Sequence, residues 1–142
     1  MLVARTPDGT IVAACGMMPP GACQPSPRQQ LRLLPLILGS GLPTALRTMR
    51  WLGTWAKSDP DERHWHVGPL AVDAPLQGQG IGSRLMEVFC ARMDEAGEDA
   101  YLETDKPINV TFYQRFGFEV VAEQPVLGRP NWFMPRRARG TG

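Results

Sequence analysis

The sequence is poor in the residues that build metal sites or disulfide frameworks. It has three cysteines, Cys15, Cys23 and Cys90, without any Cys-x-x-Cys pair, and only two histidines, His64 and His66. An odd, unpatterned set of cysteines is typical of free thiols in a reducing compartment, here expected to be the cytoplasm. With so few soft ligands, no metal site is predicted.

Charge of one sign and long apolar runs are also missing. The 15 Lys and Arg residues balance 14 Asp and Glu residues, so the net charge is +1. This balance gives no basic surface for nucleic acid or an anionic membrane. The most apolar stretch, residues 31–38, is interrupted by Pro35 and is far shorter than the roughly 20 residues that span a bilayer. The first residues do not read as a signal peptide. No nucleic-acid partner and no membrane association are predicted.

What the sequence has is the length of one domain. Its 142 residues are 43% hydrophobic, and a chain of this size buries about two-thirds of its unfolded surface. The 15 glycines and 14 prolines stay below the roughly 25–30% share that is typical of disordered chains. We therefore expect a single domain over residues 1–142 that handles a small molecule.

Turn and capping signals divide the first 60 residues into a hairpin and two helices. The β-rich runs 2–5 and 11–18 flank a Pro-Asp-Gly turn, which predicts a β-hairpin. A capping box at Ser26 predicts the start of a helix that Pro35 limits. A second helix is predicted over 43–57 with one buried face. That face consists of Ala45, Leu46, Met49, Leu52 and Ala56.

Strands and helices alternate in the rest of the chain. The predicted elements are strands at 65–72, 100–103 and 118–122, helices at 81–96 and 109–116, and a closing hairpin around 126–134. Alternation along the first of these strands places His64, His66, Gly68, Leu70 and Val72 on one face. A central strand–helix–strand unit with antiparallel pieces at both ends predicts a mixed sheet.

A glycine-rich turn, Gln77-Gly78-Gln79-Gly80-Ile81-Gly82, lies between a predicted strand and a predicted helix. Glycines allow close approach of a ligand, and the free N–H groups and positive dipole end of the helix suit a pyrophosphate. No Gly-Lys-Ser/Thr follows, which excludes a P-loop. The spacing departs from the Rossmann fingerprint, although Glu103 lies near the position of a ribose-binding acid. A tight connection without any ligand and a dinucleotide site both stay open at this point.

The turn and a later aromatic segment together resemble the GNAT superfamily of acyl-CoA-dependent N-acyltransferases. Gln77-x-x-Gly80-x-Gly82 matches its Q/R-x-x-G-x-G/A signature, and residues 112–118 resemble its F-Y-x-x-x-G-F segment. Residues 101–113 and 131–134 are similar to its puromycin acetyltransferase-like members. The resemblance extends from about His64 to Arg136. It implies an α+β fold with three layers (α/β/α), in which helices flank a mixed, mostly antiparallel sheet.

The resemblance also implies acetyl-CoA as the acyl-donor cosubstrate and a primary amine of a small molecule or peptide as the acceptor. The backbone of Leu70, Ala71 and Val72 would bind the pantetheine arm. The expected pyrophosphate-binding residues are Gln77, Gly78, Gln79, Gly80, Ile81, Gly82 and Ser83. Further cofactor contacts are expected from Asn109, Phe112 and Arg115.

Tyr113 is implied as the general acid that faces the departing thiolate. Aminolysis of a thioester needs a proton for the sulfur, and a tyrosine with a pKa near 10 still carries one at neutral pH. The alternative is an amphipathic side chain that packs a helix. His66 and Glu103 are candidate bases. A histidine that lines the substrate, a structural carboxylate, or water as the proton carrier are the alternatives.

The beginning of the sequence departs from the family pattern. The family fold normally starts with a strand and one or two helices before the hairpin to which Leu2 already belongs. This predicts an N-terminally abbreviated domain with an uncovered face, closed by a second protomer, or a fragment of a longer product. The residues 136, 137 and 139, all arginines, are expected to form a solvated basic tail. An N-acetyltransferase is the leading function; a non-catalytic acyl-CoA-binding or sensing module and a dinucleotide-binding domain are the alternatives.

Overall fold

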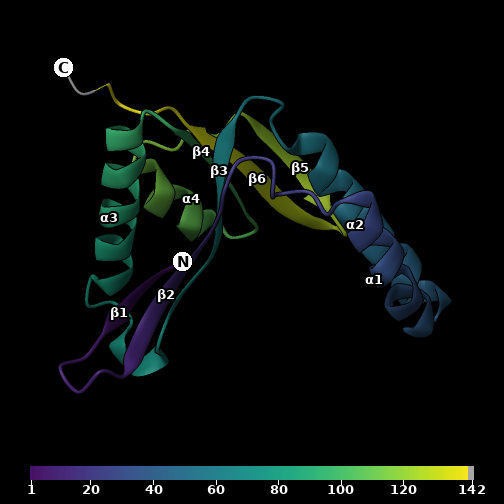
Figure 1. Ribbon diagram of the computed structural model, residues 1–142, viewed down its shortest axis with the longest axis horizontal. Helices are drawn as coiled ribbons and strands as arrows, with labels where there is room; N and C mark the ends of the chain where they lie inside the picture. Colours follow the sequence, from purple (N-terminus) through teal and green to yellow (C-terminus); the bar gives the residue numbers. More distant parts are fainter. Residues whose placement is uncertain (141–142) are drawn as a thin grey trace.

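A six-stranded sheet with helices on both faces forms the frame of the computed structural model, which describes residues 1–140 (Figure 1). The strands are β1 (Leu2–Arg5), β2 (Ile11–Met18), β3 (His64–Val72), β4 (Asp99–Thr104), β5 (Ala122–Val126) and β6 (Arg129–Arg136). The helices are α1 (Pro27–Gly39), α2 (Leu42–Ser58), α3 (Ile81–Ala96) and α4 (Pro107–Gln114), with a 3-10 turn η1 (Ala74–Leu76). The strand order is β1-β2-β3-β4-β6-β5, and β3–β4 is the parallel pair in an otherwise antiparallel sheet. The predicted mixed α+β fold is confirmed.

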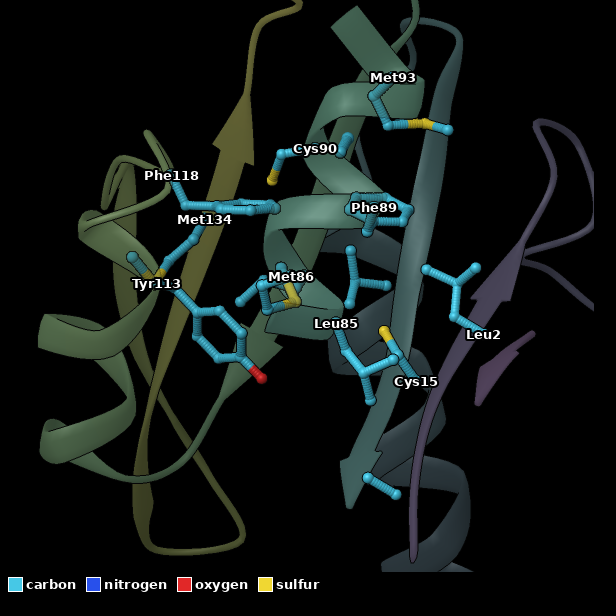
Figure 2. Packing of buried hydrophobic residues seen from close by; sticks show 14 residues of the cluster. Leu2, Cys15, Leu85, Met86, Phe89, Cys90, Met93, Tyr113, Phe118 and Met134 are labelled. Atoms are coloured by element: carbon cyan, nitrogen blue, oxygen red, sulfur yellow. The ribbon is translucent and has the colours of Figure 1, made fainter. Parts of the chain in front are cut away.

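Helix α3 anchors the main core against one face of the sheet. It begins after Gly80 and ends at Gly97, which both adopt the left-handed conformation that glycine tolerates best. The predicted bounds 81–96 are confirmed. Figure 2 shows side chains of α3 packing with residues from β2, β6 and α4. The buried side chains of α3 are Leu85, Met86, Phe89, Cys90 and Met93.

Helix α2 covers the opposite face through two tryptophans. Trp51 and Trp55 pack on a small cluster formed by Tyr101, Val126 and Phe133 of the sheet, and α1 contacts α2. The predicted buried face of α2 is wrong, since Ala45 is its one buried residue and Leu46, Met49 and Leu52 are exposed. The helix contacts the sheet through the aromatic side chains of Trp51 and Trp55 instead. Its row of apolar residues extends past the part of the helix that lies on the sheet.

Helix α1 also differs from its prediction. Its capping box at Ser26 is present, but the helix continues through Pro35 to Gly39. Pro35 removes one backbone donor, and the carbonyl left without it belongs to a helix without any buried residue, where water can satisfy it. The proline therefore does not end the helix.

A β-bulge changes the faces of β3. Cys15 pairs with Leu70 and Met17 with Val67, so one residue of β2 lies opposite two residues of β3. The alternation therefore shifts by one at Gly68 and Pro69. His66 shares the α2 face with Tyr101, whereas Leu70 and Val72 pack on the α3 core. The predicted single face for all these residues is wrong.

The last part of the sheet is also shifted relative to the prediction. Residues 118–121, expected to be a strand, run irregularly beside β6 with hydrogen bonds from Glu119 N to Pro135 O and from Val121 N to Phe133 O. The strand β5 starts at Ala122, and Leu127 and Gly128 form the turn of the predicted closing hairpin. Among the described residues, no helix is both long and apolar enough to cross a membrane.

Candidate active site

Two adjoining cavities occupy the place where β3 and β4 separate. These parallel strands pair from His64 to His66 with Asp99 to Tyr101 and then diverge. One cavity, of about 730 Å³, lies beside the start of α3. The other, of about 790 Å³, lies toward α2 and the β5–β6 hairpin. Leu70, Asn109 and Tyr113 line both cavities and mark the place where they meet.

The first cavity is built around the glycine turn. Gly78 and Gly80 have φ of 79° and 82°. Glycine adopts these positive values at little cost because it has no side chain, so the turn can fold back tightly. No side chain caps α3, and its first turn holds no acidic residue, so the amides at its start and the positive end of its dipole are available to an anion. The Gln77 side chain braces the turn by donating to the Val72 carbonyl (2.9 Å). This end of the cavity therefore fits a pyrophosphate group.

Most of the predicted cofactor residues come together in this cavity. It is lined by Leu70, Val72, Gln77, Gly78, Gly80, Ile81, Gly82, Ser83, Asn109, Phe112 and Arg115, together with Tyr113. Ala71 and Gln79 lie outside the lining. Ala71 is exposed and pairs with Ala14, while the Gln79 side chain donates to the Pro75 carbonyl (3.3 Å).

Arg115 places a positive charge in the wall of the first cavity. The Arg115 guanidinium stacks 5.1 Å from the centre of the Phe112 ring, and both residues line the cavity. Stacking holds the charge in place while leaving its edge free to bind oxygen atoms. Asn109 is held in turn by a hydrogen bond from its Nδ2 to Thr104 Oγ1 (3.0 Å).

Tyr113 stands at the junction of the two cavities. Its ring is buried between Phe112 and Phe118, and in Figure 2 its hydroxyl points away from Phe118 and Met134. Burial raises the pKa of this hydroxyl, with a smaller contribution from Cys15. The group therefore keeps its proton at neutral pH.

The two candidate bases form one unit. His66 Nε2 lies 2.9 Å from Glu103 Oε2, and both side chains are largely buried in the wall of the second cavity. Burial opposes charging of the imidazole. The hydrogen bond to Glu103 and the negative charges of Glu103 and Asp59 outweigh this effect, so the pKa of His66 is raised. The pair thus offers a carboxylate oriented by an imidazole.

Several residues of the second cavity carried no signal in the sequence. Trp51 and Trp55 of α2 line it, and the other α2 and hairpin side chains in its wall could be assigned only once the elements were placed in space. Asn131 is buried in this wall, and its Nδ2 has no hydrogen-bond partner among the described residues. The additional lining residues include Met18, Arg47, Val126, Leu127, Arg129 and Asn131.

The sequence model of the Acetyltransferase (GNAT) family matches residues 36–118, more than half of the chain. The chain belongs to this GNAT acetyltransferase family. The match includes the glycine turn, Tyr113 and the aromatic segment, so the predicted membership is confirmed.

Solved structures of GNAT-fold proteins resemble the chain over nearly its whole length. One, from Corynebacterium glutamicum, is described as histone acetyltransferase HPA2 and related acetyltransferase; it is 26% identical with a TM-score of 0.67 and matches 99% of this chain and 65% of its own. Two others share the fold at 16% identity. They are Naa20 of Chaetomium thermophilum in complex with a bisubstrate analogue (TM-score 0.58; 96% of this chain, 64% of that one) and an acetyltransferase from Bacillus cereus (0.57; 96% and 70%). The present chain thus spans about two-thirds of the length of these proteins.

Proposed function

We propose that the protein transfers an acetyl group from acetyl-CoA to a primary amine of a small molecule or peptide, by direct attack while both substrates are bound. The observation that carries this proposal is the meeting of the two cavities at Tyr113. The cavity beside α3 suits the nucleotide and pantetheine arm of the donor, and the cavity beside His66 and Glu103 suits the acceptor amine. A shared opening between them is what a direct transfer requires.

The chain's own residues would divide the reaction as follows. Asn109 and the backbone of Leu70 would position the donor arm, and the amides of the glycine turn would hold its pyrophosphate. Glu103, oriented by His66, would accept the proton that the amine loses, directly or through water. As the new N–C bond forms and the C–S bond breaks, Tyr113 would donate its proton to the departing thiolate and recover one from solvent.

Replacement of Tyr113 by phenylalanine tests this proposal. The change removes the proton donor and keeps the buried ring, so we expect kcat to fall about 10²–10⁴-fold, as is typical for loss of a general acid. The dissociation constant for CoA should stay close to that of the parent protein. Release of CoA can be followed with a thiol reagent over a panel of amines. Gln114→Ala, an exposed change at the end of the same helix, serves as the matched control.

The results of these measurements distinguish an acetyltransferase from the two alternative functions. Turnover by the parent with no amine of the panel, together with tight CoA binding, would favour a non-catalytic acyl-CoA-binding module. Stabilisation by NAD but not by CoA would favour the dinucleotide-binding alternative. Turnover that is equal in Tyr113→Phe and Gln114→Ala would remove Tyr113 from the chemistry.

We also infer that the protein works as a homodimer in the cytoplasm. Helices α1 and α2 leave many apolar side chains exposed, and an exposed apolar surface of this kind is typical of a protein contact. Leu36, for example, is 72% exposed. Sedimentation velocity of the full chain over a range of concentrations tests this inference. A stable monomer at all concentrations would contradict it.

A further inference from the structure

Four side chains with metal-binding chemistry converge beside the second cavity, and one of them, His66, also lines it. One potential ligand atom from each of Cys23, Asp59, His64 and His66 lies within 4.8 Å of the others. Cys23 belongs to the loop between β2 and α1, and Asp59 follows the end of α2. His64 and His66 project from the same face of β3, next to Tyr101. Helices α1 and α2 form a helical arm between β2 and β3. The cluster therefore joins the start and the end of this α1–α2 arm to the sheet.

The hydrogen bonds around the cluster turn lone pairs toward its centre. His64 Nδ1 lies 2.8 Å from the Glu62 carbonyl, which can only accept, so this nitrogen carries the proton and the Nε2 lone pair faces Cys23 and Asp59. His66 Nε2 bonds to the Glu103 carboxylate, so in the neutral ring Nδ1 is the unprotonated nitrogen. Two nitrogen lone pairs, a carboxylate oxygen and a thiol sulfur thus gather in a partly buried space.

Two atoms of the cluster have no hydrogen-bond partner within residues 1–140. They are Asp59 Oδ1 and His66 Nδ1, both buried. An unpaired buried acceptor costs free energy, and several acceptors side by side repel one another. A bound cation removes both costs at once. One proton shared between His64 and Asp59 would leave His66 Nδ1 unsatisfied.

The spacing of the atoms fits tetrahedral coordination. His64 Nε2 lies 3.3 Å from Asp59 Oδ1 and 3.8 Å from Cys23 Sγ. Zinc bonds of about 2.0 Å to N or O and 2.3 Å to S give tetrahedron edges of roughly 3.3 Å and 3.5 Å for these two pairs. These two pairs are therefore already close to tetrahedral spacing, and all four ligand atoms lie within 4.8 Å of one another.

We propose that Cys23, Asp59, His64 and His66 bind a divalent transition-metal ion, most simply Zn²⁺, in a closed structural site. The outer partners that orient metal ligands are present too: the Glu62 carbonyl for His64, Glu103 for His66, and Gln24, which donates to Asp59 Oδ2 (3.1 Å). With four protein ligands the site leaves no open position for chemistry. Its role is to fix the base of the α1–α2 arm and the orientation of the His66–Glu103 pair, and it does not depend on the acetyltransferase proposal.

Metal content and Co²⁺ spectroscopy of the full chain test the site. The purified protein should hold about one zinc per chain by elemental analysis, because one four-ligand site is present. After removal of metal with a chelator, Co²⁺ should give a thiolate-to-cobalt charge-transfer band and the intense visible bands of tetrahedral cobalt. Cys23→Ser should abolish the charge-transfer band and weaken Co²⁺ binding at least tenfold. Cys90→Ala, which removes a buried thiol elsewhere, should retain both properties.

Folding of each variant is checked by far-UV circular dichroism. Should Cys23→Ser not fold, Asp59→Asn keeps all nitrogen and sulfur ligands and should still weaken Co²⁺ binding. Zinc should also raise the melting temperature of the metal-free parent but not that of a folded Cys23→Ser variant. A parent protein that carries no metal and gives no charge-transfer band with Co²⁺ would overturn the proposal, and so would a band that survives Cys23→Ser.

Discussion

At the scale of single residues, a substitution of Ser83 can separate helix stability from the proposed binding of CoA. It is the third residue of α3 and lines the first cavity. Ser83→Asp adds a negative charge near the positive end of the helix dipole and should stabilise the fold by about 0.3–1 kcal/mol. The same charge would repel a pyrophosphate, so CoA binding should weaken about tenfold or more at low salt, and less at high salt. Calorimetric titration with CoA and a thermal melt measure the two effects.

The matched control for this prediction is Ser83→Asn. It has the same shape as the aspartate but no charge, so its affinity for CoA should stay near that of the parent protein. Equal weakening by Asn and Asp would show that bulk rather than charge is responsible. It would also argue against an anion at the start of α3.

The sequence predicts the role of residues that act within one continuous segment. It does not predict the role of residues that meet through long-range contacts. The glycine turn and its helix lie in one segment, so their joint role in the first cavity follows from local rules. Arg136 was expected in a solvated tail, yet it is buried and bonded to Asp94. The proposed metal-ligand cluster could not be predicted for the same reason, because Cys23 and His66 meet only through the sheet register and the end of α2.

At the scale of elements, the β2–β3 bulge decides which side chains face each cavity. It depends on a close approach of two strands that are distant in the sequence, so the regular alternation expected for β3 failed at Gly68. A Cβ added at Gly16 would lie 3.1 Å from Pro69 Cδ and 3.4 Å from Gly68 Cα. Both atoms belong to rigid parts of the chain. A side chain at position 16 would therefore crowd the bulge, and Pro69 or the Gly68 backbone would have to move by a few tenths of an ångström.

Gly16→Val is the corresponding prediction. Valine favours strands, but overpacking at this contact should lower the free energy of unfolding by about 1–3 kcal/mol. Urea denaturation measures this loss. Ala14→Val, two residues earlier on the same face of β2 and paired with the exposed Ala71, should be close to neutral. A stabilising Gly16→Val would contradict the close approach of the strands.

At the scale of the whole molecule, an ion pair connects the end of α3 to the end of the sheet. Arg136 Nη2 lies 2.7 Å from Asp94 Oδ2, and Arg136 Nε donates to the Phe116 carbonyl (2.8 Å). The Arg136 side chain is 2% exposed and that of Asp94 is 23% exposed. The hydrogen bond from Arg136 outweighs partial burial and lowers the pKa of Asp94. The folded state therefore stabilises the ionised form of the Asp94 carboxylate relative to the protonated form.

Asp94→Asn should destabilise the protein, because it leaves the buried Arg136 charge without its counter-ion. We expect a loss of about 2–3 kcal/mol at neutral pH, below the 3–5 kcal/mol typical of fully buried pairs since Asp94 is partly exposed. Because the pKa of Asp94 is lower in the folded state, its contribution is fully present above the unfolded pKa of about 3.9 and is lost as the pH falls through the folded pKa. The difference in melting temperature between parent and variant should therefore shrink below about pH 4.

Glu98→Gln, which removes the partner of the exposed Arg63, should leave the melting temperature close to that of the parent. A difference between parent and Asp94→Asn that stays constant from pH 7 to pH 3 would show that the carboxylate charge does not stabilise this junction.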